Sequence, residues 1–384
     1  MAKLGDICTV VSGSTPKTGV AEYWDGTVKW ITPAELNEDS FYITDSVRHI
    51  TEYGKEKTGL SYLPKGTVIL SSRAPIGKTA IAGCEMCCNQ GFKNLICSDA
   101  VYNEYLYFFL KSKTDYLNSL GRGATFKEIS KSIVEKIEIP LPNIEKQHQI
   151  VKELKATRNL IAHRKQQLTK LDELVKARFV EMFGDPKLNP YRFPCNSLST
   201  YITFLTSGSR GWSQYFTDSG EYFITIKNVK NCKITIQDVQ YVAPPDNAEA
   251  KRTKVQKNDL LISITADLGR TGVVTEEIAN HGAYINQHLT CIRLKDEQVN
   301  PLYVAYYMES DAGKEQFTAK NQSAVKAGLN FNAINSLKLM APPLSLQNQF
   351  ADFVAEVDKS KVEVQKALDQ TQLLFDSLMQ QYFG

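Results

Sequence analysis

The sequence has no apolar run that approaches the roughly 18 residues a membrane-spanning helix requires. Its first residues, MAKLGDICTVVSGS, hold only a short apolar stretch and no convincing cleavage site for a signal peptide. We therefore expect a cytoplasmic protein. Hydrophobic residues make up 42% of the chain and charged residues 23%, which is typical of a soluble globular protein.

Most motifs of catalytic and nucleotide-binding sites are missing as well. Neither GxGxxG nor GxSxG occurs. Gly77–Thr79 resembles the end of a phosphate-binding loop. However, Ser72 stands where the first glycine of such a loop belongs, and Pro75 lies inside the segment. Asn189–Tyr191 lacks the second proline of the Asn/Asp-Pro-Pro-aromatic motif of adenine methyltransferases. We therefore predict a non-catalytic chain that needs no cofactor.

Residues that hold metals are scarce. Cys84 and Cys87 have the Cys-x-x-Cys spacing of a zinc site, but Cys88 adjoins them and no second pair or nearby His follows. The five histidines show no helical pairing and no triad-like setting. We expect reduced thiols in the core and no metal site.

The net charge is small: 45 Lys and Arg against 42 Asp and Glu give +3. Residues 1–144 are neutral overall and residues 184–343 carry +2. A protein that holds DNA unaided is usually more basic than this. If DNA is the ligand, we expect a partner to supply part of the phosphate contacts.

Two long stretches contain neither proline nor glycine. In the first, residues 145–183, apolar residues recur at steps of seven, which predicts the seam of a helix that packs on another helix. The seam residues are Leu154, Ile161, Leu168, Val175 and Met182. About 39 residues would extend roughly 58 Å at 1.5 Å per residue, before Gly184 and Pro186 end the helix.

The second stretch, residues 346–383, supplies the partner. Its two apolar series include the seam residues Val357, Val364, Leu368 and Phe375. Residues 145–183 carry +4 and residues 344–384 carry −3, so the charges favour pairing. The alternative is two unrelated amphipathic helices, each packed on its own domain.

The two halves of the chain repeat each other. Leu63–Ala82 matches Val255–Val274, and Asn89-Gln90 matches Asn286-Gln287. The order of domain and helix therefore occurs twice. We predict an α+β fold with two similar mixed α/β domains, separated by a long antiparallel two-helix coiled coil, with pseudo-two-fold symmetry. The expected domains are 1–144 and 184–345, and the expected spacer helices are 145–183 and 346–384.

These repeated segments resemble a known family. The carriers are LGDICTVVSGSTPKT from residue 4, WITPAEL from 30, VILSSRAPIGKTAIA from 68, NQGFKN from 89, IPLPNIEKQHQIV from 139 and ARFVEMFGDP from 177. Together they resemble the specificity (S) subunit of type I restriction-modification systems. The second half departs from the pattern at Thr265–Asp267 and at Gln287-His288.

The resemblance implies a function as well as a fold. Each of two target-recognition domains would read one half of a bipartite, asymmetric DNA site. The paired helices would act as a ruler and as the dock for two methyltransferase subunits, through which restriction subunits join the complex. The chain itself would be the non-catalytic specificity subunit.

Contacts to DNA are expected from loops of the two domains. Lys and Arg beside turns bind phosphate, and Arg, Asn and Gln reach base edges in the major groove. The candidates are Lys17, Arg73, Lys78, Gln90, Lys93 and Arg122 in the first domain, and Arg210, Lys227, Lys230, Arg270, Gln287 and Lys326 in the second. Any one of them is, alternatively, a solvated surface residue. The recurrence of the Asn-Gln pair in both halves favours a structural role for that pair.

Two other functions compete with this one. The first is a self-sufficient endonuclease or methyltransferase, against which the missing motifs argue. The second is a structural adaptor that holds two protein-binding domains at a fixed spacing, which the domain charges of 0 and +2 permit. Binding to random DNA, measured with and without a methyltransferase, would separate these hypotheses.

Overall fold

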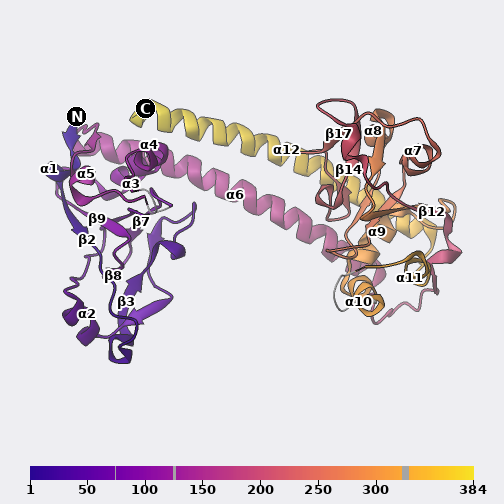
Figure 1. The fold of residues 1–384 in the computed structure, drawn as a ribbon, viewed down its shortest axis with the longest axis horizontal. Helices are drawn as coiled ribbons and strands as arrows, with labels where there is room; N and C mark the ends of the chain where they lie inside the picture. The colour runs from indigo at the N-terminus through magenta and orange to yellow at the C-terminus, as the bar shows by residue number, and fades with distance from the viewer. Residues whose placement is uncertain (74, 124–126, 322–327) are drawn as a thin grey trace. The chain divides into compact units, whose positions relative to one another are not determined.

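The computed structural model describes residues 1–73, 75–123, 127–321 and 328–384. The chain divides into two compact units, unit 1 with residues 1–166 and 365–384, and unit 2 with residues 167–364. Two helices of 40 residues each, α6 (Ile144–Phe183) and α12 (Leu344–Phe383), contribute a segment to both units (Figure 1). No helix among the described residues has the length and apolarity needed to cross a membrane.

A five-stranded sheet forms the centre of the domain in unit 1. Its order is β2 (Cys8–Ser12), β9 (Phe92–Cys97), β6 (Val68–Ser71), β7 (Thr79–Ala82) and β4 (Tyr42–Ile43). Every residue of β6 and β7 is buried. Their sequences, VILS and TAIA, therefore read as continuous apolar runs rather than alternating ones.

The domain in unit 2 repeats this sheet. Its four-stranded sheet has the order β12 (Ile202–Ser207), β21 (Leu289–Leu294), β18 (Leu260–Ser263) and β19 (Thr271–Val273). These strands correspond in sequence order and pairing to β2, β9, β6 and β7, and all neighbouring pairs among them are antiparallel. The fold class is confirmed: each unit holds a mixed α/β domain built on the same strand order.

Smaller sheets and short helices complete the domains. In unit 1 they are β1 (Ala2–Lys3), β3 (Trp24–Ile31), β5 (Arg48–Ile50), β8 (Cys87–Cys88), β10 (Glu138–Ile139), α1 (Leu4–Ile7), α2 (Glu52–Thr58), α3 (Asn103–Ser112), α4 (Thr114–Ser119) and α5 (Lys131–Glu135), with 3-10 turns η1 (Ala21–Tyr23) and η2 (Pro33–Glu35). In unit 2 they are β11 (Cys195–Ser197), β13 (Phe216–Thr217), β14 (Glu221–Ile224), β15 (Val229–Lys230), β16 (Lys233–Ile234), β17 (Gln240–Val242), β20 (Ala283–Ile285), β22 (Lys338–Met340), α7 (Ala248–Thr253), α8 (Glu276–His281), α9 (Pro301–Glu309), α10 (Asp311–Lys320) and α11 (Phe331–Asn335), with turns η3 (Leu198–Thr200), η4 (Trp212–Tyr215) and η5 (Ile226–Asn228).

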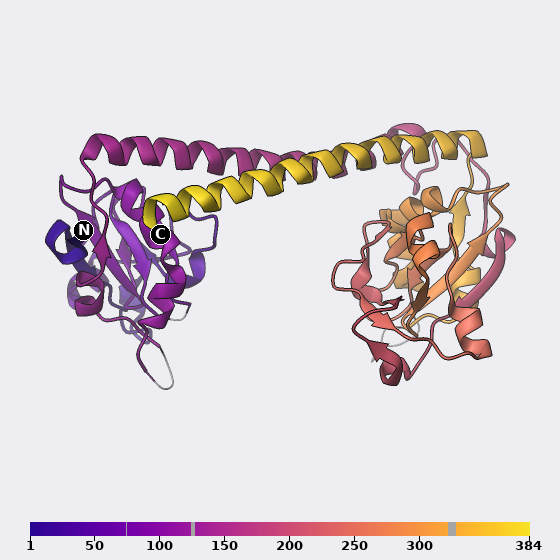
Figure 2. The same ribbon diagram turned by 90° about the horizontal axis from the view of Figure 1, so that it is seen from above.

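Helices α6 and α12 run antiparallel within each unit. In unit 1, the Tyr382 hydroxyl of α12 bonds to the Glu153 carboxylate of α6. In unit 2, Lys361 pairs with Asp172, and the Phe350 ring lies 5.6 Å from that of Phe183. Later residues of α6 therefore meet earlier residues of α12, as an antiparallel coiled coil requires. Figure 2 shows the two helix segments of unit 1 beside its domain.

The predicted seam residues lie on the inner sides of these helices. Leu154, Ile161, Val175, Val357 and Val364 are buried, and Leu168, Met182, Leu368 and Phe375 are partly buried. Leu154 and Phe375 join the core of unit 1, whereas Val175, Met182 and Val357 join that of unit 2. Each helix segment is thus part of a domain core as well as of a helix pair.

A buried glutamine fixes each domain to the start of its long helix. The Gln147 amide accepts a hydrogen bond from the Tyr102 N–H at 2.8 Å and donates to the carbonyls of Ala100 at 3.0 Å and Pro142 at 2.8 Å. The Gln347 amide accepts from the Asn300 N–H at 2.8 Å and donates to the Pro342 carbonyl at 2.7 Å. Both side chains are fully buried, so these bonds have no water to replace them.

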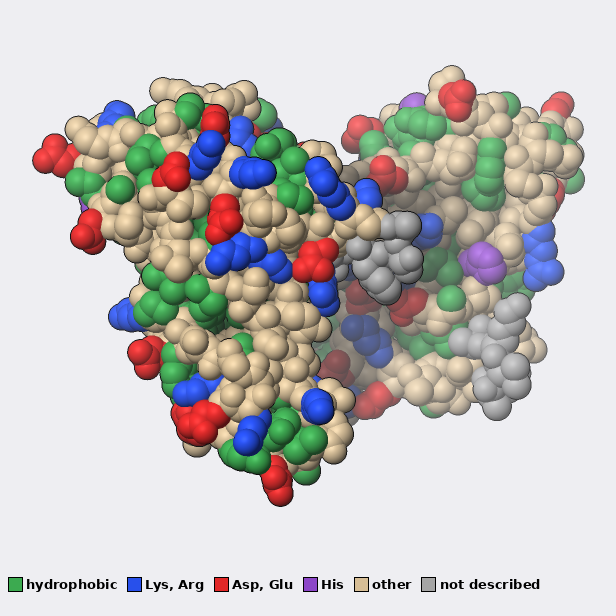
Figure 3. All heavy atoms as spheres, turned by 60° about the vertical axis from the view of Figure 1, so that its left-hand side comes forward, with side chains coloured by type: hydrophobic (Ala, Val, Ile, Leu, Met, Phe, Trp, Pro, Cys, Tyr) green, Lys and Arg blue, Asp and Glu red, His purple; other side chains and the backbone are tan. Residues whose placement is uncertain are grey.

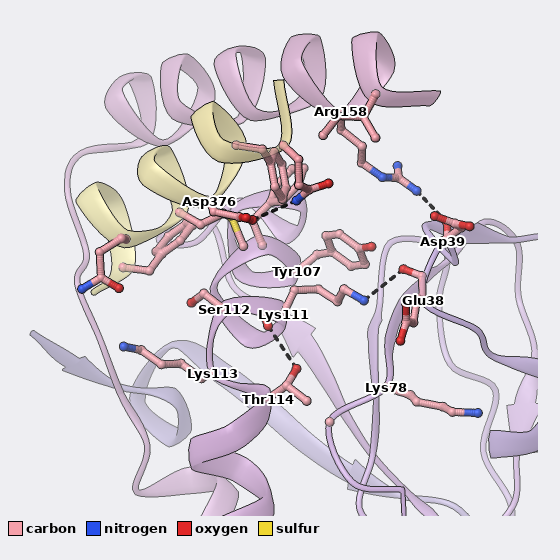
Figure 4. A pocket seen from close by; sticks show the side chains of 18 of the residues that line it. Glu38, Asp39, Lys78, Tyr107, Lys111, Ser112, Lys113, Thr114, Arg158 and Asp376 are labelled. Atoms are coloured by element: carbon pink, nitrogen blue, oxygen red, sulfur yellow. Dashed lines mark hydrogen bonds between the residues drawn. The ribbon is translucent and has the colours of Figure 1, made fainter. Parts of the chain in front are cut away.

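A cavity of about 720 Å³ lies in unit 1, where the domain meets the two helix segments (Figure 4). Tyr107 and Phe375 contribute to its apolar lining. Lys111 donates to the Glu38 carbonyl at 3.0 Å and Arg158 to the Asp39 carbonyl at 2.6 Å. Burial lowers the pKa of Lys111, and Arg158 nearby adds to the shift. These cations therefore tie the loop at residues 37–39 to helices α3 and α6.

Candidate nucleic-acid interface

Five loops of unit 1 meet at one edge of its domain. We define the domain 1 loop cluster as residues 13–17, 32–36, 72–78, 89–91 and 122–128, of which the structure describes all but 74 and 124–126. Backbone bonds join the loops: the Ser72 N–H donates to the Gly91 carbonyl at 2.7 Å, and the Ile129 N–H donates to the Ser72 carbonyl at 2.9 Å. All six candidates of the first domain lie in this cluster or, as Lys93 does, directly beside it.

Glycine and asparagine set the shape of this cluster. A Cβ atom at Gly13 would lie 2.0 Å from the Asn89 carbonyl oxygen, so only glycine fits there. The Asn89 side chain accepts a hydrogen bond from the Gly91 N–H at 2.8 Å, which closes an Asx turn. The Thr32 N–H donates to the Glu35 carboxylate at 2.8 Å within a capping box.

One carboxylate collects two of the predicted cations. The Glu128 side chain accepts from Arg73 Nε at 2.9 Å and from Lys93 Nζ at 3.1 Å. The Arg73 side chain is 45% exposed and that of Lys93 only 8%. Burial raises the pKa of Glu128, but the hydrogen bonds from Lys93 and Arg73 outweigh it and leave the pKa below its ordinary value. The carboxylate is therefore ionised at neutral pH.

The other candidates of this domain differ in accessibility. Lys78 donates to the carbonyls of Leu36 at 2.7 Å and Pro33 at 3.2 Å, so its ammonium group is used inside the domain. Gln90 accepts from the Thr15 hydroxyl. Lys17 and Arg122 are exposed. Contact with DNA stays a prediction at all of these positions, and at Lys78 and Lys93 it would require existing hydrogen bonds to be exchanged.

The second domain builds the same arrangement. We define the domain 2 loop cluster as residues 208–212, 225–228, 264–270, 286–288 and 328–329. The Ile264 N–H donates to the His288 carbonyl at 3.0 Å, and the Leu329 N–H donates to the Ile264 carbonyl at 2.9 Å. A Cβ atom at Gly208 would lie 2.2 Å from the Asn286 carbonyl oxygen. Each of these features has its counterpart in the domain 1 loop cluster.

The exposed groups of the second cluster are different. The Thr265 hydroxyl bonds to His288 Nδ1 at 2.7 Å, where the first domain has Arg73 and Gly91. Arg270 Nε donates to Asp267 at 2.6 Å. The amide of Gln287 lies 3.2 Å from His288 Nε2. Sequence reasoning missed Glu128, because its partners Arg73 and Lys93 lie 55 and 35 residues away in the chain. It identified Thr265 and His288 only as departures from the first half, not as a hydrogen-bonded pair.

The remaining candidates of the second domain are placed as follows. Arg210 and Lys227 are exposed in the domain 2 loop cluster. Lys230 is exposed on β15 and lies outside the cluster. The strand paired with β15 is β16, which contacts helix α12 through the ion pair of Lys233 with Asp358. Lys326 lies outside the described residues.

Positive and negative side chains are mixed on the domain surface. On the face of unit 1 turned to the viewer in Figure 3, Lys and Arg alternate with Asp and Glu. Among the described residues, no group of three or more His, Cys, Asp or Glu could hold a metal ion. The geometry therefore offers hydrogen-bond donors and acceptors on loop tips held by a rigid scaffold.

Comparison with known proteins bears on both clusters. The family model "Type I restriction modification DNA specificity domain" matches residues 1–173 and 214–371. A relative from Methanocaldococcus jannaschii, the type I restriction enzyme MjaIX specificity subunit, is 42% identical over 186 residues, 48% of this chain and 43% of that protein. The match thus spans less than half the length of that relative. The EcoR124I/EcoR124II specificity subunit of Escherichia coli is 25% identical over 155 residues, 38% of each chain.

Solved structures share the fold over the whole chain. The S subunit of a type I restriction-modification system from M. genitalium superposes with a TM-score of 0.57 at 15% identity, covering 100% of this chain and 95% of that one. A chain from a study of complex assembly and conformational transition of the type I R-M system gives a TM-score of 0.64 at 17% identity, covering 100% and 96%.

Proposed function

The chain belongs to the family of type I restriction modification DNA specificity domains, and from that membership we propose that it is the DNA sequence-specificity subunit of a type I restriction-modification complex. In this proposal the chain performs no catalysis. It selects the DNA on which other subunits act. The observation that carries the proposal is the repetition of one loop scaffold with different exposed side chains in the two domains.

Each loop cluster would read one half of a bipartite, asymmetric DNA site. The backbone hydrogen bond from Ser72 to Gly91 recurs between Ile264 and His288, so the loops of both domains are held by the same frame of backbone contacts. Arg73 and Thr265 occupy the same place on that frame. Because different side chains there present different donors and acceptors, the two clusters would select different bases.

The long helices would set the distance between the two half-sites. Each is 40 residues long and contains neither glycine nor proline, so roughly 60 Å of uninterrupted helix separates its ends. One turn of DNA is about 34–36 Å, and paired readers space their half-sites by it or by multiples. Gln147 and Gln347 support the role, because a ruler requires stiff joints as well as a stiff rod.

The same helices would hold two methyltransferase subunits and, through them, restriction subunits. Large apolar side chains are exposed along α6 and α12, each about half exposed or more: Leu160, Leu174, Val180, Val362, Leu373 and Leu374. A contiguous exposed apolar patch marks a surface that a protein partner covers, and the proposal requires these side chains to form such patches. A partner would also bring the positive charge that a chain of net charge +3 lacks.

An exchange of one domain tests the proposal. Residues 1–144 are replaced by the equivalent domain of a relative that modifies a different sequence, and the methylated sites in the host genome are mapped. We expect one half of the split motif to change and the other to persist. The matched control replaces residues 184–345 and should change only the other half. A change in both halves, or in neither, would count against independent readers.

A further inference from the structure

The Arg73 guanidinium in the domain 1 loop cluster already holds an anion. Its Nε donates to the Glu128 carboxylate at 2.9 Å, and Glu128 also accepts from Lys93 at 3.1 Å. Hydrogen bonds from the Arg122 N–H to the Glu128 carbonyl and back, both 3.0 Å, fix the backbone of Glu128. The carboxylate is therefore positioned by the scaffold.

A carboxylate and a DNA phosphate use the same donors. Both present oxygens that match the guanidinium fork, and both bind Lys as a point charge. DNA without the recognised sequence binds mainly through its phosphates. An internal carboxylate on Arg73 thus competes with this non-specific binding.

We propose that Glu128 is an internal substitute for a DNA phosphate, which occupies Arg73 until DNA displaces it and thereby weakens binding to sequences that are not the target; Asp267 does the same for Arg270 in the second domain. This inference rests on the proposed function, because it concerns regulation of the same DNA-binding loops. It makes Glu128 and Asp267 specificity determinants that need not touch a base.

The burial of the three side chains permits the exchange. Arg73 is 45% exposed and can rotate from Glu128 to a phosphate. Lys93 is 8% exposed, and its other neighbour is the Ser72 hydroxyl at 3.4 Å, so it stays behind. Because Lys93 stays in place, the Glu128 carboxylate keeps a cation after Arg73 leaves. A partly buried carboxylate without a cation would be costly and would oppose the exchange.

The second domain pairs a cation with a carboxylate at another place on the frame, since Arg270 stands where the first domain has Lys78. Arg270 Nε donates to Asp267 at 2.6 Å, and the Asp267 side chain is 59% exposed. Thr290 stands at the position of Lys93 and is fully buried. Since no lysine stays behind there, release of Arg270 exposes Asp267 directly to water rather than to a buried cation. Water solvates an exposed carboxylate well, so this exchange is also accessible.

The test measures binding of the full chain, in complex with its methyltransferase subunits, to random-sequence duplex DNA and to a duplex with the methylated motif. Fluorescence anisotropy is recorded over a series of salt concentrations. In Glu128→Gln, Arg73 loses its charged partner, and we expect affinity for random DNA to rise about 3- to 10-fold. The salt slope should steepen by about 0.9 for the added phosphate contact. Affinity for the motif should rise less, so the specificity ratio falls.

Two further variants make the result specific. If the gain arises from Arg73, then Arg73→Gln combined with Glu128→Gln returns random-DNA affinity to that of Arg73→Gln alone. Asp267→Asn alters an exposed pair and should raise random-DNA affinity about 2- to 5-fold without affecting folding. The Asp267→Asn variant alone tests the inference if thermal unfolding shows that Glu128→Gln destabilises the first domain by leaving Lys93 unpaired.

The outcomes separate the inference from the proposed function. A wild-type complex that binds the motif no better than random DNA would overturn the proposed function and the inference with it. A wild-type complex that discriminates, with folded Glu128→Gln and Asp267→Asn variants that bind random DNA at wild-type affinity and salt slope, would overturn the inference alone.

Discussion

The two loop clusters share their backbone and differ in the side chains they expose. Gly13 and Gly208 each pack against the backbone of the asparagine in an Asn-Gln pair. The loops that follow β6 and β18 also close in the same way. The Ser71 hydroxyl accepts a hydrogen bond from the Lys78 N–H, and the Ser263 hydroxyl accepts one from the Arg270 N–H, both at 2.9 Å. On this frame the first domain places an ion cluster around Glu128, and the second a hydrogen bond between Thr265 and His288. Shared backbone contacts thus define the scaffold, and the side chains placed on it vary.

The joints between domain and helix differ in the same manner. Both use a buried glutamine, but the first adds the Glu104 carboxylate, which accepts from Lys155 at 2.9 Å and from Tyr42 at 2.6 Å. The second adds aromatic contacts of Phe350, including one with Tyr306 at 5.1 Å between ring centroids. Beside its buried glutamine, the first joint thus carries an ion pair and the second an aromatic cluster, and the two should respond differently to perturbation.

The largest effect is expected where the two scaffolds agree most closely. Gly13→Ala and Gly208→Ala each place a methyl group within 2.2 Å of a backbone oxygen, so the loop must move. We expect each to lower the free energy of unfolding by about 2–4 kcal/mol, confined to the domain that carries the change. Thermal unfolding combined with hydrogen exchange measures both the size and the location of the loss.

Gly19→Ala is the matched control, since a Cβ atom at Gly19 meets no atom within 4 Å. It should change stability by less than about 0.5 kcal/mol. If Gly13→Ala is as stable as Gly19→Ala, the close approach of the two loops is not a requirement of the scaffold.

A smaller effect is expected at the buried glutamines. Gln147→Leu leaves the Tyr102 N–H and the carbonyls of Ala100 and Pro142 without their partner, at a cost of about 2–4 kcal/mol. Gln347→Leu removes two bonds rather than three and should cost about 1–3 kcal/mol. Hydrogen exchange at the first turns of α6 and α12 reports the loosening.

Gln149 and Gln349 are exposed and provide matched controls on the same helices. Their replacement by leucine should leave exchange at the first turns unchanged. Equal effects of Gln147→Leu and Gln149→Leu would show that burial of the amide does not fix the joint.

The long helices and the repeat were predictable from sequence, and the partners of individual charges were not. The predicted spacers at 145–183 and 346–384 appear as helices at Ile144–Phe183 and Leu344–Phe383, because a 40-residue stretch without Gly or Pro and with a seven-residue period leaves few alternatives. The domain boundaries themselves stay a prediction. The capping pattern Thr32-x-x-Glu35 and the Gly-Ser pairs that follow β2 and β12 were readable signals of these turns.

The candidate site was predictable only as a set of loops. The sequence marks Lys93 as a cation near a turn, but its partner Glu128 lies 35 residues away in the chain. Lys78 reaches carbonyls 42 and 45 residues away. Whether a lysine faces phosphate or a neighbouring loop depends on tertiary contacts of this length, which no local pattern encodes. Recurrence was the better guide, since it indicated a structural role for Asn89, whose side chain closes its own turn.

Acid should separate the two joints. Burial raises the pKa of Glu104, but hydrogen bonds from Tyr42 and Lys155 outweigh it and leave the pKa below the ordinary value of 4.5. The stabilisation is therefore complete above about pH 4.5 and is lost as the pH falls through the lower pKa of the folded state. Ala355 stands where the first helix has Lys155, so the second joint lacks this pair. We expect the first domain to lose more of its free energy of unfolding than the second in acid.

Urea unfolding at pH 7, 5 and 3.5, monitored separately in each domain by hydrogen exchange, measures this difference. Glu104→Gln should remove the excess pH dependence of the first domain, because the amide does not titrate. If the wild-type domains lose stability in parallel as the pH falls, the Glu104 pair contributes nothing specific to the joint.

The sharpest test of how the domains work together comes from lengthening both helices, which should leave the stability of each domain nearly unchanged. Because α6 and α12 pair antiparallel, four residues inserted after Lys165 require four more in the facing part of α12, after Lys366. The insertion adds about 6 Å and rotates the second half by roughly 40° beyond one full turn. Six ångströms is close to two base pairs at about 3.4 Å each.

Since neither loop cluster is altered, we expect both half-motifs to persist while the unread gap between them grows by one or two base pairs. The residual rotation should lower affinity less than about tenfold. Mapping of methylated sites in cells that carry the paired insertion measures the gap, and an insertion after Lys165 alone, which leaves the helices unequal, is the control expected to lose activity. A gap that stays the same with full activity would mean that the two readers are spaced by something other than the helices, and that their rigid joints serve another purpose.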